Sequence, residues 1–182
     1  MTDSELQQLK RDVQILKDIE AVKRVKYAYF RCIDTANLAE LRELLHPKIH
    51  AKLVGGTYSI EFNTRDEYIE MVANSFNSEF VGQHNGHHPE VDILSETEAV
   101  ATWYLTDTAI DFRRKVTTTG SSLYTDKYLK TDGKWQIVDT AYQRIYEIVE
   151  DTPERPPLTS HYLAEHGRKE ITFTVVDKYN KG

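Results

Sequence analysis

Residues 98–112 of the chain read EAVATWYLTDTAIDF, and residues 117–130 read TTTGSSLYTDKYLK. Both stretches are rich in β-branched and aromatic side chains, which suit the half-buried surface of a pleated sheet. Asp132-Gly133 then separates the second stretch from the apolar residues 135–138. An Asp-Gly pair between two apolar runs is a strong hairpin signal, because glycine readily adopts the positive φ of a tight turn. The sequence therefore predicts a run of antiparallel strands.

Two charged residues interrupt apolar faces of these strands. Side chains alternate between the two faces of a strand, so Asp107 shares a face with Trp103 and Leu105. On the third strand, Arg144 shares a face with Tyr142. Charges that interrupt an apolar or aromatic row are out of place in a plain core, and they favour a functional site.

Length and composition limit the classes of protein. The 182 residues favour one domain with a real core, and 40% hydrophobic and 29% charged residues are ordinary for a soluble protein. The net charge of −6 argues against a nucleic-acid partner. The single Cys32 excludes internal disulfides and fits a reducing compartment. The polar N-terminus is no secretory signal, and no apolar run approaches the ~20 residues of a membrane span. We expect a cytoplasmic protein without a membrane partner.

The N-terminal part of the chain has helical periodicity. Apolar residues three and four apart predict a first helix from about Ser4 to about Ile33. Its early part is polar enough to lie outside the core, against another subunit. The apolar residues of that early part are Leu6, Leu9, Val13 and Leu16.

The remaining elements follow from caps and turn residues. Asn37 is a candidate cap for a short helix that Pro47 stops, and a hairpin is expected around Gly55-Gly56. Thr64 opens a third helix through a capping box. We interpret residues 77–86 as a loop, with the sheet starting near residue 90. The proline-rich residues 151–182 form an extension of the domain at residues 1–150, with one more candidate strand at 171–176. Helices first and strands later indicate an α+β fold with helices on one face of a sheet.

Several segments resemble the SnoaL-like, or nuclear-transport-factor-2-like, superfamily, which includes scytalone dehydratase and ketosteroid isomerase. The chain is most similar to the bacterial bile acid 7α-dehydratases over about residues 16–150. The matching segments are 29–34 (YFRCID), 84–90 (HNGHHPE), 103–107 (WYLTD), 123–128 (LYTDKY), 132–135 (DGKW) and 142–146 (YQRIY). The resemblance implies a cone-shaped, curved antiparallel sheet with the N-terminal helices on its concave face, the NTF2-like or cystatin-like fold. The chain departs from the family pattern at Thr106, at His88 and in its long tail.

The resemblance also implies residue roles. The family's catalytic tyrosine, histidine and carboxylate fall on Tyr29, His84 and Asp107. Its pocket aspartate and arginine fall on Asp34 and Arg144. We count Tyr142 and Trp103 as further substrate-binding residues. The implied activity is a cofactor-independent dehydration of a hydroxysteroid-type substrate, specifically bile acid 7α-dehydration of a 3-oxo-4-ene intermediate, with CoA thioesters as possible substrates. The implied assembly is a homo-oligomer, specifically a trimer, with a dimer as the alternative.

Elementary chemistry supports these roles. Dehydration beside an activated C–H needs a base for the carbon-bound proton, an acid for the leaving hydroxyl and a donor for the developing enolate. Imidazole side chains exchange protons near neutral pH, so His84 can serve as base and then acid. Asp107 is expected within ~3.2 Å of His84, where it would fix the ring tautomer. Tyr29 can donate to a substrate carbonyl.

Each residue also has a structural interpretation. Tyr29 can be an ordinary core tyrosine, His84 an exposed loop residue, Asp107 a strand-end residue, and Asp34 a turn cap. Arg144 can form a surface ion pair. A metal site at the three histidines His84, His87 and His88 has no standard ligand spacing, so we expect no metal and no cofactor. Cys32 lies inside a predicted helix, which argues against a nucleophile.

Two other functions remain open. The same fold can serve as a non-catalytic small-molecule-binding protein, which an apolar pocket without a His–Asp contact would favour. It can also serve as an isomerase or cyclase of polyketide or terpene metabolism, using the same tyrosine, histidine and aspartate.

Overall fold

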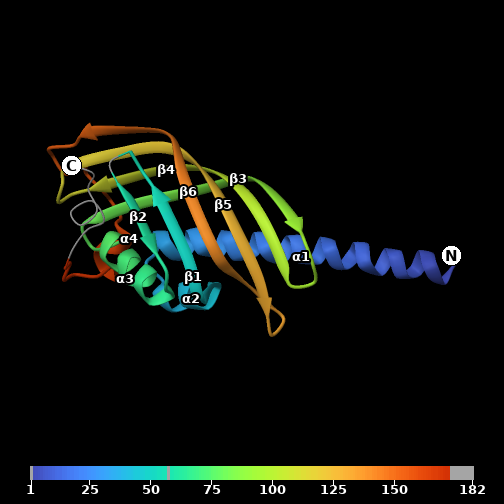
Figure 1. Ribbon diagram of the computed structural model, residues 1–182. Coiled ribbons are helices and arrows are strands. Elements are labelled where there is room, and N and C mark those ends of the chain that lie inside the picture. Colours follow the sequence, from blue (N-terminus) through green and yellow to red (C-terminus); the bar gives the residue numbers. More distant parts are fainter. Residues whose placement is uncertain (1, 57, 173–182) are drawn as a thin grey trace.

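The computed structural model describes residues 2–56 and 58–172 (Figure 1). Its elements combine helices with one long, curved sheet, and they confirm the α+β class. In chain order they are α1 (Asp3–Asp34), α2 (Leu38–Leu44), β1 (Leu45–Val54), β2 (Ser59–Phe62), α3 (Arg65–Ser75), β3 (Phe80–Ile93), β4 (Glu98–Asp111), β5 (Val116–Thr131), β6 (Lys134–Asp151) and α4 (Tyr162–His166).

The described strands form one open sheet in the order β2-β1-β6-β5-β4-β3, and α1 packs on it (Figure 1). Neighbouring strands are antiparallel with one exception, because β1 runs parallel to β6. The expected curved antiparallel sheet is therefore found with one correction, since the parallel β1–β6 pair makes the sheet mixed. The parallel pair arises because the chain leaves β1 through the β1–β2 hairpin, and β6 later returns to the free side of β1.

Local signals place most of the elements. Asn37 and Thr64 each accept a backbone N–H of the helix that follows, as expected of N-caps. The β5–β6 hairpin turns at Asp132 and Gly133, whose φ values are 51° and 77°. Pro47 does not end α2, which stops at Leu44, but lies inside β1.

The strand β3 begins ten residues before the predicted start of the sheet. Residues 77–86, expected to form a loop, belong mostly to β3, and His84 and Gly86 pair with β4. A Cβ at Gly86 would collide with the ring of Phe30 on α1. Glycine is therefore needed here for close helix–sheet packing and not for a turn.

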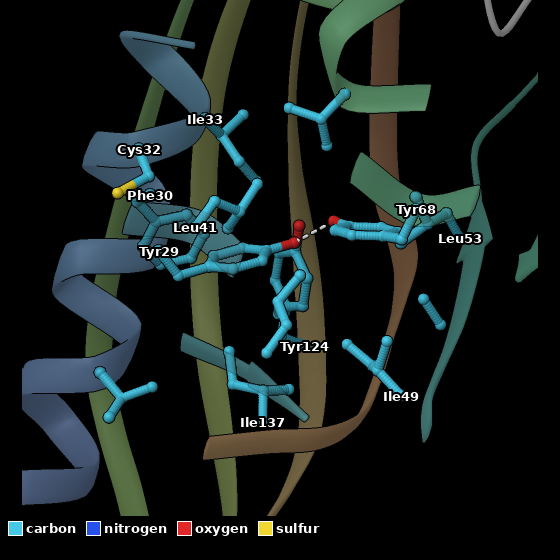
Figure 2. Close-up of a cluster of buried hydrophobic side chains, with 14 of the residues drawn as sticks. Tyr29, Phe30, Cys32, Ile33, Leu41, Ile49, Leu53, Tyr68, Tyr124 and Ile137 are labelled. Atoms are coloured by element: carbon cyan, nitrogen blue, oxygen red, sulfur yellow. Dashed lines mark hydrogen bonds between the residues drawn. The ribbon is translucent and has the colours of Figure 1, made fainter. Parts of the chain in front are cut away.

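The second half of α1 and the facing residues of α2, α3 and the sheet form the core. Figure 2 shows Tyr29 and Ile33 of α1 beside Tyr68 of α3 and Tyr124 of β5, all in one buried cluster. The first half of α1 extends beyond the sheet (Figure 1), and its residues up to Lys17 are exposed or, at Leu6, half-buried. No helix in the described ranges is long and apolar enough to cross a membrane.

The described part of the C-terminal segment lies against the junction of α3 and β3. Arg168 makes an ion pair with Glu70, and Thr172 donates from its backbone to Asn74. Leu163 of α4 is buried. Ile171 and Thr172 are not part of a strand, and the rest of the predicted strand at 171–176 lies outside the described residues.

Candidate active site

A cavity of about 170 Å³ lies between the helices and the curved sheet. Its walls come from α1, α3 and the strands, and its apolar side includes Leu53, Met71 and Leu105. Its polar side carries the charged and phenolic groups described below. Of the residues predicted to act on a substrate, Tyr29, His84, Asp107, Tyr142 and Arg144 line this cavity.

His84 is the first polar element of the cavity wall, and Asp34, which is not among the lining residues, holds it in place. The Nδ1 atom of His84 lies 2.6 Å from Oδ1 of Asp34, and the backbone N–H of His84 donates to Oδ2 at 2.9 Å. Asp34 is the last residue of α1, so the end of the helix presents its carboxylate to β3. The two contacts fix the position of the carboxylate. The ring of Phe30 stacks on the imidazole with 6.1 Å between ring centroids.

Asp107 does not hold His84, although the strand register places the two residues opposite each other. The Asp107 carboxylate instead forms a bidentate pair with Arg144, in which Nη2 donates to Oδ2 at 2.8 Å. No hydrogen bond joins His84 to Asp107 in the described structure. The expected His84–Asp107 pair is therefore wrong. A planar guanidinium matches a carboxylate better than an imidazole does, and the end of α1 supplies the histidine with Asp34.

Arg144 holds two carboxylates, those of Asp107 and Glu147. Besides its pair with Asp107, it donates from Nε to Glu147 at 2.8 Å. Burial alone would lower the pKa of Arg144, but the hydrogen bond and charge of Asp107 outweigh it and raise the pKa above its ordinary value. The group of Arg144, Asp107 and Glu147 therefore carries a net charge of about −1 when both carboxylates are ionised.

Tyrosine hydroxyls form the second polar element of the cavity. The hydroxyl of Tyr29 contacts that of Tyr68 (Figure 2), and the hydroxyl of Tyr58 contacts that of Tyr142. Tyr124 lies between the two pairs, with its ring 5.2 Å from that of Tyr142. Burial raises the pKa of all five phenols, so they are neutral donors at physiological pH.

Sequence reasoning missed Tyr58, Tyr68 and Tyr124 as members of the site. The presence of 11 tyrosines in 182 residues was a signal that could have indicated a cluster of phenols. Helical spacing places Tyr68 on an inward face of α3, but it does not distinguish a cavity wall from a packed core.

An ion pair buried beneath the tyrosines was also missed. The Nζ atom of Lys26 lies 2.8 Å from Oδ2 of Asp126, and both side chains are fully buried. The contact is an ion pair and not a well-directed hydrogen bond. The ammonium also lies 3.7 Å from the ring centroid of Tyr124 and 4.4 Å from that of Tyr29. Burial lowers the pKa of Lys26.

Trp103 and Cys32 lie in the core and not at the cavity. Trp103, expected to bind substrate, is fully buried away from the cavity lining, and its ring meets that of Tyr27 edge-on. A side chain of its size on the inward face of β4 fills the space beneath α1. Burial raises the pKa of Cys32 to about 11, so its thiol is protonated at neutral pH.

The remaining histidines of the predicted cluster have separate surroundings. Nε2 of His87 lies 3.0 Å from the hydroxyl of Thr106, and His88 occupies the irregularity in β3 with φ of 48°. Among the described residues, no group of three or more His, Cys, Asp or Glu side chains could hold a metal ion.

A curved, open sheet with helices on one face, and a cavity between them that has an apolar and a polar side, defines a class of small-molecule-binding domains. The family model of the SnoaL-like domain matches residues 14–141. The chain therefore belongs to the SnoaL-like domain family.

Solved structures of distant relatives share this architecture. A candidate scytalone dehydratase from Novosphingobium aromaticivorans DSM 12444 has a TM-score of 0.66 and 17% identity, over 82% of this chain and 99% of that chain. The hexachlorocyclohexane dehydrochlorinase LinA-type3 from Novosphingobium barchaimii LL02 has a TM-score of 0.70 and 13% identity, over 81% and 99%. ActVI-ORFA from Streptomyces coelicolor has a TM-score of 0.57 and 14% identity, over 70% and 96%. At these identities the likeness concerns the fold, and the neighbours include lyase-type enzymes.

Proposed function

We propose that the protein is a cofactor-independent dehydratase that removes water from a hydroxylated cyclic ketone. The observation that carries the proposal is the contact of Asp34 with His84, a residue of the cavity wall. A carboxylate on Nδ1 sets the tautomer in which Nε2 carries the lone pair, so Nε2 is the basic nitrogen available to a substrate. A protein that only binds a ligand would need no more than an apolar cavity, so this contact favours an enzyme over a binding protein.

The reaction would proceed by proton transfer through His84. Nε2 takes a proton from the carbon that is activated by the ketone, and the electron pair moves to the carbonyl oxygen as an enolate. The enolate then expels the hydroxyl group, which leaves as water after Nε2–H returns the proton. Asp34 stabilises the imidazolium between the two steps.

The phenol pairs would hold the developing enolate. The pair of Tyr29 and Tyr68 contains two hydroxyl protons and uses one between its own oxygens. The second proton can be donated to a substrate oxygen, where a preorganised donor contributes ~10²–10³ in rate. Tyr29 thus acts as half of a pair and not as a single donor.

The substrate class that we propose is a hydroxysteroid, specifically a bile acid intermediate that is dehydrated at the 7α position. The cavity of about 170 Å³ is smaller than the ~300 Å³ at the lower end of common ligand sites, so only the reacting rings would lie inside. The rest of the substrate, including any CoA thioester, would extend through the mouth. We also propose that the protein acts as a homo-oligomer, specifically a trimer.

Incubation with 7α-hydroxy-3-oxo-4-ene steroids and with smaller cyclic hydroxy ketones tests the reaction. Loss of water extends the conjugated system, so a new absorbance at longer wavelength is the expected result. His84→Ala should remove it, and the exposed His88→Ala is the matched control. A rearranged product that keeps its oxygen would favour an isomerase. Tight binding without turnover of any compound would favour a binding protein.

A further inference from the structure

The first half of α1 carries an apolar stripe that the other described residues do not cover. Leu9, Val13 and Leu16 are 50%, 40% and 62% exposed. They lie on the part of the helix that extends away from the sheet (Figure 1). A helical segment of about 15 residues in water is marginal without packing, so a partner on this stripe would stabilise it.

The stripe faces away from the core. At about 100° per residue, the stripe residues Leu9 and Val13 point about 160° away from the mean direction of Val22, Tyr29 and Ile33, which pack on the sheet. Another part of the same domain therefore cannot cover the stripe by continuing the packing of α1. A partner of the stripe must therefore approach α1 from the side opposite the sheet.

The spacing of the stripe is that of a coiled coil. Leu6, Leu9, Val13 and Leu16 follow intervals of three, four and three, which are the a and d positions of two heptads. A seam of this type is complementary to a second copy of itself, since each a or d side chain inserts between four residues of the facing helix.

The charges beside the stripe determine its orientation. Glu5 and Asp12 occupy the g positions, whereas Lys10 and Lys17 occupy the e positions. In parallel helices each g residue faces the e residue five positions later on the neighbour, which joins Asp12 to Lys17 and Glu5 to Lys10. Antiparallel helices would place g residues against g residues, and acidic side chains would meet.

We infer that α1 helices from separate copies of this chain associate in parallel and in register through Leu6, Leu9, Val13 and Leu16. The inference does not depend on the proposed reaction. It applies to a dimer and a trimer alike, because both place g residues against e residues of a parallel neighbour. The cavities of the copies would then lie at the same end of the bundle.

Disulfide trapping of the full chain tests the orientation. In a parallel bundle, Leu9→Cys places two thiols opposite each other at a d position, so oxidation should link most of the protein into dimers. Arg11→Cys, on the other side of the same exposed segment, is the matched control and should stay unlinked. Background linking should be low, because the native Cys32 is buried. Preferential linking of Leu9→Cys to Val13→Cys in a mixture would indicate antiparallel helices and would overturn the inference.

Charge exchange tests the partner independently. Glu5 already caps the helix with Thr2, so Asp12 and Lys17 are the better pair to change. Lys17→Glu and Asp12→Lys should each weaken self-association in sedimentation by about tenfold, since two attractive contacts per dimer become repulsive. A mixture of the two variants should associate more strongly than either variant alone, because Asp12 then faces Lys17 and the introduced Lys and Glu face each other. A natural protein that sediments as a monomer at micromolar concentration, or a mixture that gains nothing, would exclude this interface.

Discussion

The contact that Nδ1 of His84 makes determines which residue orients the ring. Nδ1 faces Asp34 at the end of α1, while Asp107 on the adjacent strand is bound by Arg144. The two carboxylates therefore have separate tasks, one toward the proposed base and one toward a buried cation. Substitution of each carboxylate should have distinguishable kinetic effects.

Asp34→Asn should lower kcat by about 10²–10⁴ with little change in KM, because an amide favours the wrong tautomer of His84. Asp107→Asn should mainly raise KM, because it weakens the pair that holds Arg144 at the cavity wall. Steady-state kinetics on a substrate found in the dehydration screen separate the two effects. Equal losses of kcat in both variants would contradict this division of roles.

Lys26 should be required for stability through Asp126. Asp126 also accepts hydrogen bonds from Thr140 at 2.7 Å and from Tyr128 at 2.8 Å. Lys26→Met would leave a buried carboxylate without its cation, at a cost of about 3–5 kcal/mol in unfolding free energy. Adding Asp126→Asn should restore most of that loss, since the amide oxygen still accepts from Thr140. Urea denaturation measures both variants, and a double variant no more stable than the single one would be the contrary result.

At the scale of elements, His50 of β1 links three strands. Nε2 lies 2.8 Å from Glu61 on β2, and Nδ1 lies 3.1 Å from Asp139 on β6. The hydrogen bond with Glu61 raises the pKa of His50, burial opposes this, and Asp139 raises it further. The folded state therefore stabilises the protonated form of His50 more than the unfolded chain does.

The stabilisation by His50 should depend on pH in a defined direction. Because the folded-state pKa is raised, the contribution is complete below the unfolded value of ~6.5 and is lost as pH rises through the folded pKa. Between about pH 5.5 and 8.5, the unfolding free energy of the natural protein should therefore fall relative to that of His50→Gln. Parallel pH dependences of the two proteins in chemical denaturation would refute the role of this bridge.

The elements differ in how far the sequence could predict them. Helix caps at Asn37 and Thr64 and the turn at Asp132-Gly133 depend on neighbouring residues, so local patterns identify them. The start of β3 depends on a tertiary contact, the approach of Phe30 to Gly86, which no local pattern contains. Glycines in residues 77–86 therefore indicated a loop where the chain forms a strand.

The candidate site shows the same limit. Strand alternation correctly identified Asp107 and Arg144 as charges on inward faces, but it could not show that they pair with each other across β5. The partner of His84 depends on where α1 ends relative to β3, which is a property of helix–sheet packing. Side-chain type and face were thus predictable, whereas partner choice required the assembled fold.

For the molecule as a whole, Leu163 fixes the C-terminal segment to the end of the domain. Its side chain is 3% exposed, whereas Leu158 in the same segment is 39% exposed. Leu163→Ala should lower the free energy that holds the C-terminal segment on the domain by about 2–5 kcal/mol, and so release the segment. Limited proteolysis within residues 152–161 should accelerate, while Leu158→Ala, the matched control, should behave like the natural protein. Equal cleavage rates in the two variants would argue against anchoring by Leu163.

The parallel pairing of β1 with β6 also has a consequence for synthesis of the chain on the ribosome. β1 is complete at Val54, but its partner is complete only at Asp151, about 100 residues later. At translation rates of ~5–20 residues per second, the β1–β2 hairpin waits about 5–20 s with one edge unpaired. During that interval the exposed edge can pair with other nascent chains. Slow elongation between residues 54 and 151 should therefore increase aggregation of this protein more than slow elongation elsewhere.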